Sequence, residues 1–246
     1  MKRRSLILII TVLVVIFLIL PFYYLIIGSI EVKDLLGFLW VIPLTIIALF
    51  QEQLKKELFA PDLQIDFNLR PPYCLKTQIK RTAVARTKYG VEMGITPTLI
   101  SNAYYFRFCT KNKGQSQARL CECIAENLWE YKVSKWEKDE TFQPINLKWS
   151  NEKSQDEFMN INPNYPGGFC DLVHIEEGHT NLYIDYKQPI PNSQVAKLQP
   201  GTKYRIKVSL YSENASAVSK TFEIFWSGKY ENKPEEMFKK ITIKSF

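Results

Sequence analysis

Two long apolar segments dominate the hydrophobic pattern near the N-terminus. The first covers about 6–28 and the second about 35–50, and neither contains a charged residue. A helix of about 20 apolar residues crosses the roughly 30 Å hydrocarbon core of a bilayer. The short polar connection between the segments predicts two antiparallel transmembrane helices, followed by a short cytosolic helical extension that reaches residue 60.

Alternatives exist for both segments. The first is also compatible with a cleaved signal peptide, but it is longer than a signal core and no cleavage site follows it. The second segment is slightly short and contains Pro43, so a buried or interfacial helix is its alternative. We favour two spans, because an apolar stretch of this length has no other evident partner in the chain.

Basic residues around the spans predict their orientation. The outer flanks carry Lys2, Arg3, Arg4, Lys55 and Lys56, whereas the connection has one lysine beside two acids. Positive residues remain on the cytoplasmic side. We therefore predict an integral protein of the cell inner or plasma membrane, with both termini and the following domain in the cytoplasm. Five cysteines without regular spacing agree with a reducing compartment.

After Pro61 the apolar residues alternate with polar ones, which is the period of half-buried strands. The alternation is clearest where Tyr204, Ile206, Val208 and Leu210 share one face. Strands are expected at 63–69, 104–110, 118–133, 142–149, 171–175, 182–186, 203–208 and 220–226. The segments 77–100 and 135–168 do not fit a minimal sandwich and are expected to be insertions or long loops. The tail 233–240 predicts a short helix, and 241–244 a last edge strand.

The residues Leu198-Gln-Pro-Gly-Thr-Lys-Tyr204 resemble the tyrosine corner of fibronectin type III and related immunoglobulin-like sandwiches. The resemblance implies that Pro200 and Gly201 form a turn and that the Tyr204 hydroxyl bonds to the backbone a few residues upstream. The resemblance is to the immunoglobulin-like superfold as a whole and does not assign the chain to a particular family. The expected fold class is thus a membrane α-helical hairpin (domain 1–60) plus a mainly-β domain (61–246), an antiparallel immunoglobulin-like β-sandwich with insertions.

Metal and catalytic residues have weak support in the sequence. Cys121 and Cys123 lie on one face of a predicted strand, and Cys170 and His174 complete a conceivable four-ligand zinc set. Cysteines on a core-facing strand are more often small apolar residues of the core. His174 is expected to be structural. We therefore expect no metal, no cofactor and no catalytic residues, and we do not expect an enzyme.

A run of basic residues without acids lies between positions 69 and 91. It comprises Lys76, Lys80, Arg81, Arg86 and Lys88. Three interpretations remain open: a solvated loop, a patch that contacts anionic lipid headgroups, or a site for a phosphate or nucleotide. The net charge of +7 is not strongly clustered, so a nucleic-acid partner is not expected.

Two of the tryptophans, Trp149 and Trp226, are expected in the core. Trp136 lies between charged residues and is expected to be exposed, where it could belong to an interface. The leading hypothesis is a membrane-anchored cytosolic β-sandwich that acts as a binding or scaffolding module for an unknown protein or small ligand.

The alternative hypothesis is a two-span membrane sensor-effector, whose β domain binds a small anionic ligand and drives membrane oligomerisation or permeabilisation. The expected partners are the lipid bilayer, anionic headgroups, an unknown protein or small ligand, and further copies of the chain through its transmembrane helices.

Overall fold

The computed structural model describes residues 59–81, 84–86, 92–95, 99–150, 158–164, 168–187 and 196–246, together with single positions between Val12 and Gln51. The chain divides into two compact units, Met1–Ala60 and Pro61–Phe246.

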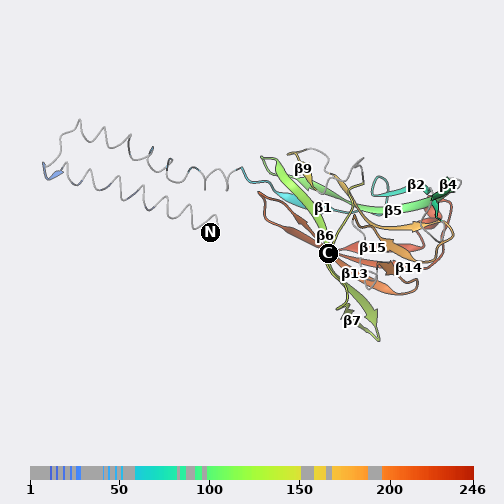
Figure 1. The fold of residues 1–246 in the computed structure, drawn as a ribbon. Helices are drawn as coiled ribbons and strands as arrows, with labels where there is room; N and C mark the ends of the chain where they lie inside the picture. Colours follow the sequence, from blue (N-terminus) through green and yellow to red (C-terminus); the bar gives the residue numbers. More distant parts are fainter. Residues whose placement is uncertain are drawn as a thin grey trace. The chain divides into compact units, whose positions relative to one another are not determined.

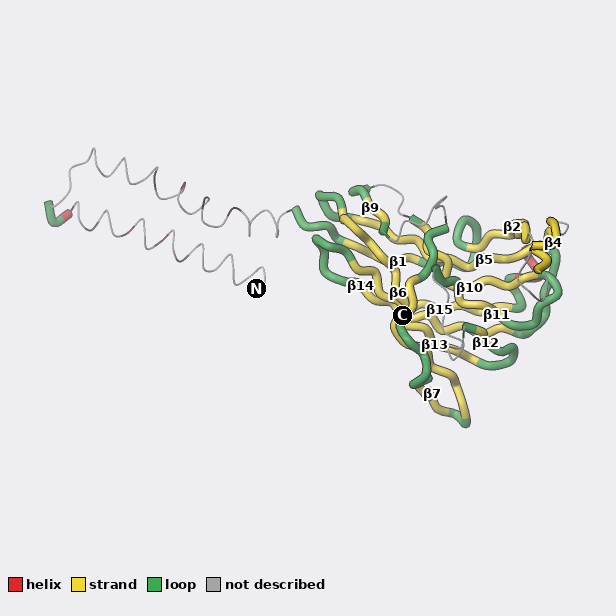
Figure 2. Tube along the Cα trace, viewed as in Figure 1, coloured by secondary structure: helices red, strands yellow, loops and turns green. Residues whose placement is uncertain are grey.

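The second unit is built from two antiparallel sheets, an arrangement like that of a β-sandwich (Figures 1 and 2). Sheet 1 contains β1 (Leu63–Asp66), β2 (Cys74–Arg81), β5 (Leu99–Asn112), β10 (Phe169–Glu176), β11 (Leu182–Ile184) and β12 (Lys197–Leu198). Sheet 2 contains β6 (Ala118–Lys132), β7 (Lys135–Lys138), β8 (Ile145–Asn146), β9 (Met159–Ile161), β13 (Lys203–Tyr211), β14 (Val218–Trp226) and β15 (Ile241–Ser245). A small pair consists of β3 (Val84–Arg86) and β4 (Glu92–Ile95).

The core lies between the inner faces of the two sheets, as the alternation predicts. Phe106 and Phe108 of β5 are fully buried, and Phe108 stacks on Phe222 of β14 with ring centroids 5.6 Å apart. Trp149 and Trp226 are both 1 % exposed, which confirms their predicted place. Packed aromatic and branched side chains of this kind supply most of the stability of a two-sheet fold.

One position on β13 departs from strict alternation. Ser209 alternates with Val208 and Leu210 and so falls on the face of Lys203 and Lys207, yet it is fully buried. The β6–β13 register shifts between Lys207 and Val208, and the Ser209 hydroxyl bonds to that of Ser219 at 2.7 Å. The bulge and this hydrogen bond allow a polar side chain to be buried without an unsatisfied group.

The turn before β13 has the features that the resemblance to a tyrosine corner implies. Gly201 has a positive φ of 76°, and its N–H donates to the Trp226 carbonyl at 2.7 Å. The Gln199 N–H donates to the Tyr204 hydroxyl at 3.1 Å. A Cβ at Gly228 would lie 2.7 Å from the Pro200 Cβ, so this corner has no room for a larger residue there.

The membrane part of the predicted fold class must be corrected. Among the residues that the structure describes, no helix has both the length and the apolar character needed to cross a membrane. A span needs about 20 residues, whereas the helix with described bounds, α3 (Pro234–Met237), has four. The predicted spans at about 6–28 and 35–50 lie mostly outside the described residues. The predicted localisation, an integral membrane protein with a cytoplasmic β domain, depended on those spans, and the same finding overturns it.

The two predicted insertions contain regular structure. Positions 77–81 belong to β2, which pairs with β5 from Cys74–Phe106 to Arg81–Leu99. The second insertion contains β7, β8 and β9, which pair with β6. β8 lies within the strand predicted at 142–149. β7 and β9 were missed because their short sequences carry few alternating apolar residues, so pairing with the long central strand β6 determines them. The predicted C-terminal helix and edge strand correspond to α3 and β15.

Candidate functional site

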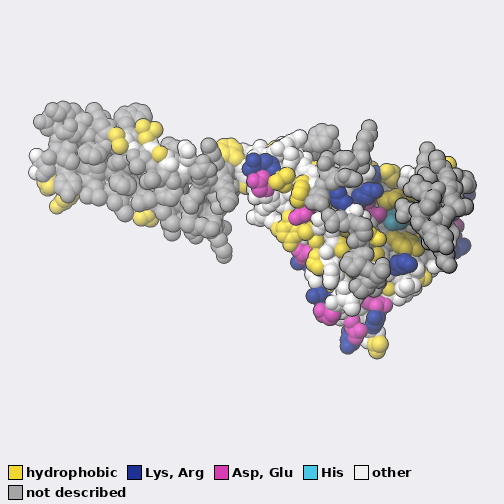
Figure 3. All heavy atoms as spheres, viewed as in Figure 1, with side chains coloured by type: hydrophobic (Ala, Val, Ile, Leu, Met, Phe, Trp, Pro, Cys, Tyr) yellow, Lys and Arg dark blue, Asp and Glu magenta, His cyan; other side chains and the backbone are white. Residues whose placement is uncertain are grey.

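The β6–β7 hairpin projects beyond the two sheets (Figure 1). Its two faces differ because cross-strand partners share a face. Glu130 and Glu137 form one partner pair, and Tyr131 and Trp136 form the next. We call the first the charged face and the second the aromatic face. Figure 3 shows charged side chains of both signs gathered around the end of this projection.

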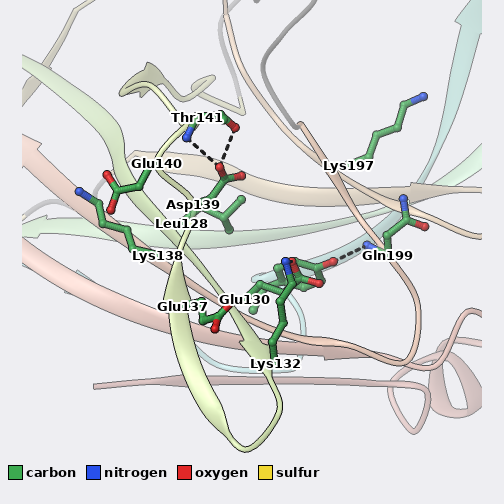
Figure 4. A pocket seen from close by; sticks show the side chains of 11 residues that line it. Leu128, Glu130, Lys132, Glu137, Lys138, Asp139, Glu140, Thr141, Lys197 and Gln199 are labelled. Atoms are coloured by element: carbon green, nitrogen blue, oxygen red, sulfur yellow. Dashed lines mark hydrogen bonds and ion pairs between the residues drawn. The ribbon is translucent and has the colours of Figure 1, made fainter.

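A pocket of about 510 Å³ lies on the charged side of the hairpin. Its floor is apolar, because Leu128 and Tyr204 are buried core residues. Figure 4 shows Glu130 and Lys132 side by side, and Asp139 turned onto Thr141. The lining is Leu128, Glu130, Lys132, Glu137, Lys138, Asp139, Glu140, Thr141, Lys197, Gln199 and Tyr204. Four carboxylates against three lysines give this pocket a slight acidic excess.

Several charged groups of the pocket side are already paired. Lys132 Nζ lies 2.6 Å from Glu130, and Lys135 Nζ lies 2.9 Å from Glu137. The hydrogen bond to Glu130 raises the pKa of Lys132, and the bond from Lys135 lowers the pKa of Glu137. The Asp139 carboxylate accepts from the N–H and hydroxyl of Thr141. Both pairs are exposed to solvent, so each adds little to stability.

The aromatic face combines two rings with two cations. The Tyr131 and Trp136 centroids are 5.1 Å apart. The Arg205 guanidinium of β13 lies 4.0 Å from the Trp136 centroid, and Lys203 Nζ lies 5.7 Å from the Tyr131 centroid. Arg205 also donates twice to one oxygen of Glu223, at 2.8 and 3.0 Å. These contacts fix the rings while leaving Tyr131 39 % exposed.

The tip of the hairpin has an unusual backbone. Val133 and Ser134 both have positive φ, 44° and 66°. A two-residue turn of this kind normally contains Asn or Gly, and a β-branched residue is strained there. Val133 is also 93 % exposed. The tip thus presents an apolar side chain to solvent at a position where the backbone disfavours it.

A second polar cluster lies on sheet 1. Tyr105, His174 and Tyr183 are cross-strand neighbours on β5, β10 and β11. His174 stacks between the two tyrosines with centroid distances of 5.1 and 5.5 Å. Its Nδ1 lies 2.9 Å from Asp185 and its Nε2 lies 3.4 Å from Glu176. We call these five residues the His174 cluster.

The environment of His174 favours its charged form. Burial alone would lower its pKa, but Asp185 and Glu176 together raise the pKa above its ordinary value. The side chains of Asp185 and Glu176 are only 10 % and 5 % exposed. Because both ring nitrogens already face carboxylates, His174 is placed to hold strands β10 and β11 together rather than to accept a substrate proton.

The predicted metal candidates do not converge. In the described ranges no group of three or more His, Cys, Asp or Glu side chains could hold a metal ion. Cys121, Cys123 and Cys170 are buried, and His174 contacts carboxylates instead. Burial raises the pKa of Cys121 to about 11, which disfavours the thiolate that a metal needs. Asp185 and Glu176 face opposite nitrogens of the His174 ring, so these three side chains do not converge on one point where a metal ion could bind.

The predicted basic run is only partly described. Lys76 donates to the carbonyl and side-chain oxygens of Asn232 at 3.0 and 3.2 Å, so it secures the C-terminal segment against sheet 1. The backbones of Lys80 and Arg81 belong to β2 and that of Arg86 to β3, and their side chains lie outside the described part, as does Lys88. The three interpretations of this run therefore stay predictions.

The sequence indicated Trp136 as an interface candidate and His174 as a structural residue, but it linked neither of them to Arg205, Tyr105 or Asp185. Trp136 was expected to be exposed and is half-buried against Arg205. The available signal was the short Lys132-Val-Ser-Lys135 sequence, which separates Tyr131 and Trp136 by a hairpin turn. No protein-family model matches the chain, and no curated protein matches its sequence.

Proposed function

We propose that this chain is a protein-recognition module, built on an immunoglobulin-like β-sandwich, which binds its partner through the β6–β7 hairpin. The observation that carries the proposal is the set of Tyr131, Trp136 and Val133 on the projecting hairpin, with Arg205 of β13 packed against Trp136. Tyr131 and Val133 are exposed, whereas Trp136 and Arg205 are half-buried. Tyrosine, tryptophan and arginine are the residue types that dominate binding energy in protein interfaces.

The energetics of the hairpin tip support the proposal. Exposing nearly all of Val133 gains no burial energy, and the positive φ of a β-branched residue costs about 1–2 kcal/mol. Neither feature stabilises the free domain. Strain and exposed apolar surface are common at binding sites, where a partner covers the side chain.

The rigidity of the aromatic face supports recognition for a second reason. Trp136 is held between Tyr131 and Arg205, and Arg205 is held by Glu223. A side chain that is already ordered loses little conformational entropy when a partner binds. The immunoglobulin-like assignment of the scaffold is supported by the bond between Gln199 N–H and the Tyr204 hydroxyl.

The test is site-specific photo-cross-linking in the full chain. A photoreactive phenylalanine at position 133 should capture one discrete protein partner in the cells that express the chain. The same residue at Gln115, an exposed position in the turn at the opposite end of β6, should not capture it. Capture at 133 should be lost with Trp136→Ala, while the unfolding midpoint stays near that of the parent. Equal capture at both positions, or none at 133, contradicts the proposal.

A further inference from the structure

The outer face of sheet 2 continues the aromatic face of the hairpin across three further strands. Trp129 is the register partner of Arg205, Arg205 of Glu223, and Glu223 of Lys244. In the adjacent row, Phe225 is the partner of Lys203, whose Nζ lies over Tyr131. Both rows lie on one face of the sheet, because Lys203 and Arg205 on β13, like Phe225 and Glu223 on β14, are two positions apart. The hairpin rings are therefore one end of a larger surface.

The cations of this surface are of two kinds. Arg205 is paired with Glu223 at 2.8 Å, and Lys207 with Glu126 at 2.5 Å. Lys203 and Lys244 are exposed and form no ion pair with any described carboxylate. The surface thus has two lysines without an ion pair to a described carboxylate, Lys203 beside the hairpin rings and Lys244 on β15.

The opposite side of the hairpin has a slight acidic excess, because four carboxylates face three lysines in its pocket. Glu137, Asp139 and Glu140 line the pocket within four consecutive positions, with Glu130 opposite Glu137 on the neighbouring strand. A negatively charged ligand therefore meets a more favourable charge on the outer face of sheet 2 than on that side. Complementary charge fixes which surface a partner uses and in which orientation it docks.

We propose that the outer face of sheet 2, with the hairpin, binds an acidic protein segment that places apolar side chains against Trp136 and Tyr131 and carboxylates near Lys203 and Lys244. This inference rests on the proposed recognition function and specifies its partner. Two unpaired lysines complement a short acidic segment. They are far from the row of six or more cations with which proteins track a nucleic-acid backbone.

The first arm of the test reverses the two unpaired charges. Lys203→Glu with Lys244→Glu should weaken capture at position 133 at least tenfold. The matched control, Lys113→Glu with Lys233→Glu, changes the net charge equally at exposed lysines elsewhere and should leave capture unchanged. Mass spectrometry should identify a cross-linked segment of net negative charge. A neutral or basic segment, or equal loss in both double variants, overturns the inference while the recognition function stands.

The second arm uses three labelled probes with the purified full chain. They are a 20-residue peptide that alternates Glu with Leu and Phe, its counterpart with Lys in place of Glu, and a thymidine 20-mer of single-stranded DNA. Fluorescence anisotropy should show binding of the acidic peptide alone, tenfold or more weakened by the Lys203 and Lys244 reversals and by raised salt. Stronger binding of the DNA, or equal binding of both peptides, contradicts an acidic protein segment. Absence of capture at position 133 overturns the recognition function, and this inference with it.

Discussion

The outer faces of the two sheets use similar side chains for different purposes. On sheet 1, His174 stacks between two tyrosines and faces two carboxylates that are nearly buried. On sheet 2, Arg205 stacks on Trp136 and pairs with Glu223, but its side chain is 36 % exposed. Both faces combine a cation, aromatic rings and acids. The difference in burial determines whether the charges hold strands together or remain available to a partner.

Burial changes the consequence of losing one charged member. A buried carboxylate that loses its cation is left unpaired in a medium of low dielectric, and this costs about 3–5 kcal/mol. An exposed carboxylate is solvated by water, and its pair contributes about 1 kcal/mol or less. The His174 cluster is therefore expected to affect folding, whereas the Arg205 set is expected to affect binding.

The largest predicted effect comes from His174→Ala. At about pH 6 this change should lower the free energy of unfolding by about 3 kcal/mol, because Asp185 and Glu176 then lack their cation. Arg205→Ala should cost about 1 kcal/mol. Chemical denaturation of the full chain measures both. If the two variants lost equal free energy of unfolding, the difference in burial would not explain the different roles of the two outer faces.

The pH dependence of the His174 effect has a definite sign. The folded pKa of His174 lies above its ordinary value of 6.5. Its stabilising contribution is therefore fully present below that value and is lost as pH rises through the folded pKa. The stability gap between the parent and His174→Ala should narrow from about pH 6 to about pH 9. A gap that widens over this range would contradict a charged His174.

The second prediction concerns Asp171, which is 5 % exposed beside the same cluster. Burial raises the pKa of its carboxyl to about 6, although the hydroxyl of Ser150 donates to it at 2.5 Å. Because the folded pKa exceeds the ordinary value of 3.8, stability falls as pH rises through about 6. Asp171→Asn keeps an acceptor for Ser150 and should stabilise the chain by about 1–2 kcal/mol at pH 8.

The control for this prediction is Asp66→Asn. Asp66 pairs with Lys111 at 2.6 Å, but both side chains are more than a third exposed, so its replacement should cost less than 1 kcal/mol. Thermal unfolding of both variants at pH 5 and pH 8 measures how the effect of each carboxylate on stability changes with pH. A loss of stability for Asp171→Asn at pH 8 would mean that attraction to Arg107 outweighs the cost of burial.

Much of the β architecture could be predicted from local pattern. Alternation identified β13 and β14, and the Pro-Gly turn before Tyr204 indicated the corner. The short strands β7 and β9 could not be found this way, because each depends on pairing with β6. The membrane hairpin was predicted from apolar length alone, and the described residues give no helix that meets this requirement.

The two sites were less predictable than the fold, for a physical reason. Tyr105 lies on β5, far in sequence from His174 on β10 and Tyr183 on the following strand β11, and register makes the three residues neighbours. Likewise, Arg205 meets Trp136 through the pairing of β13 with β6 and of β6 with β7. A sequence names the residue types, but long-range register determines which of them meet.

The smallest predicted effect concerns the hairpin tip and sharpens the distinction between stability and recognition. Replacing Val133-Ser134 by Asn-Gly suits two positive φ angles and should stabilise the chain by about 1 kcal/mol. The same change removes the exposed valine, so the partner captured at position 133 should bind the more stable variant more weakly. Denaturation midpoints and binding of the purified partner measure the two effects. If stability rises and binding is unchanged, the tip is a strained turn without a role in recognition, and the aromatic face alone must carry the interface.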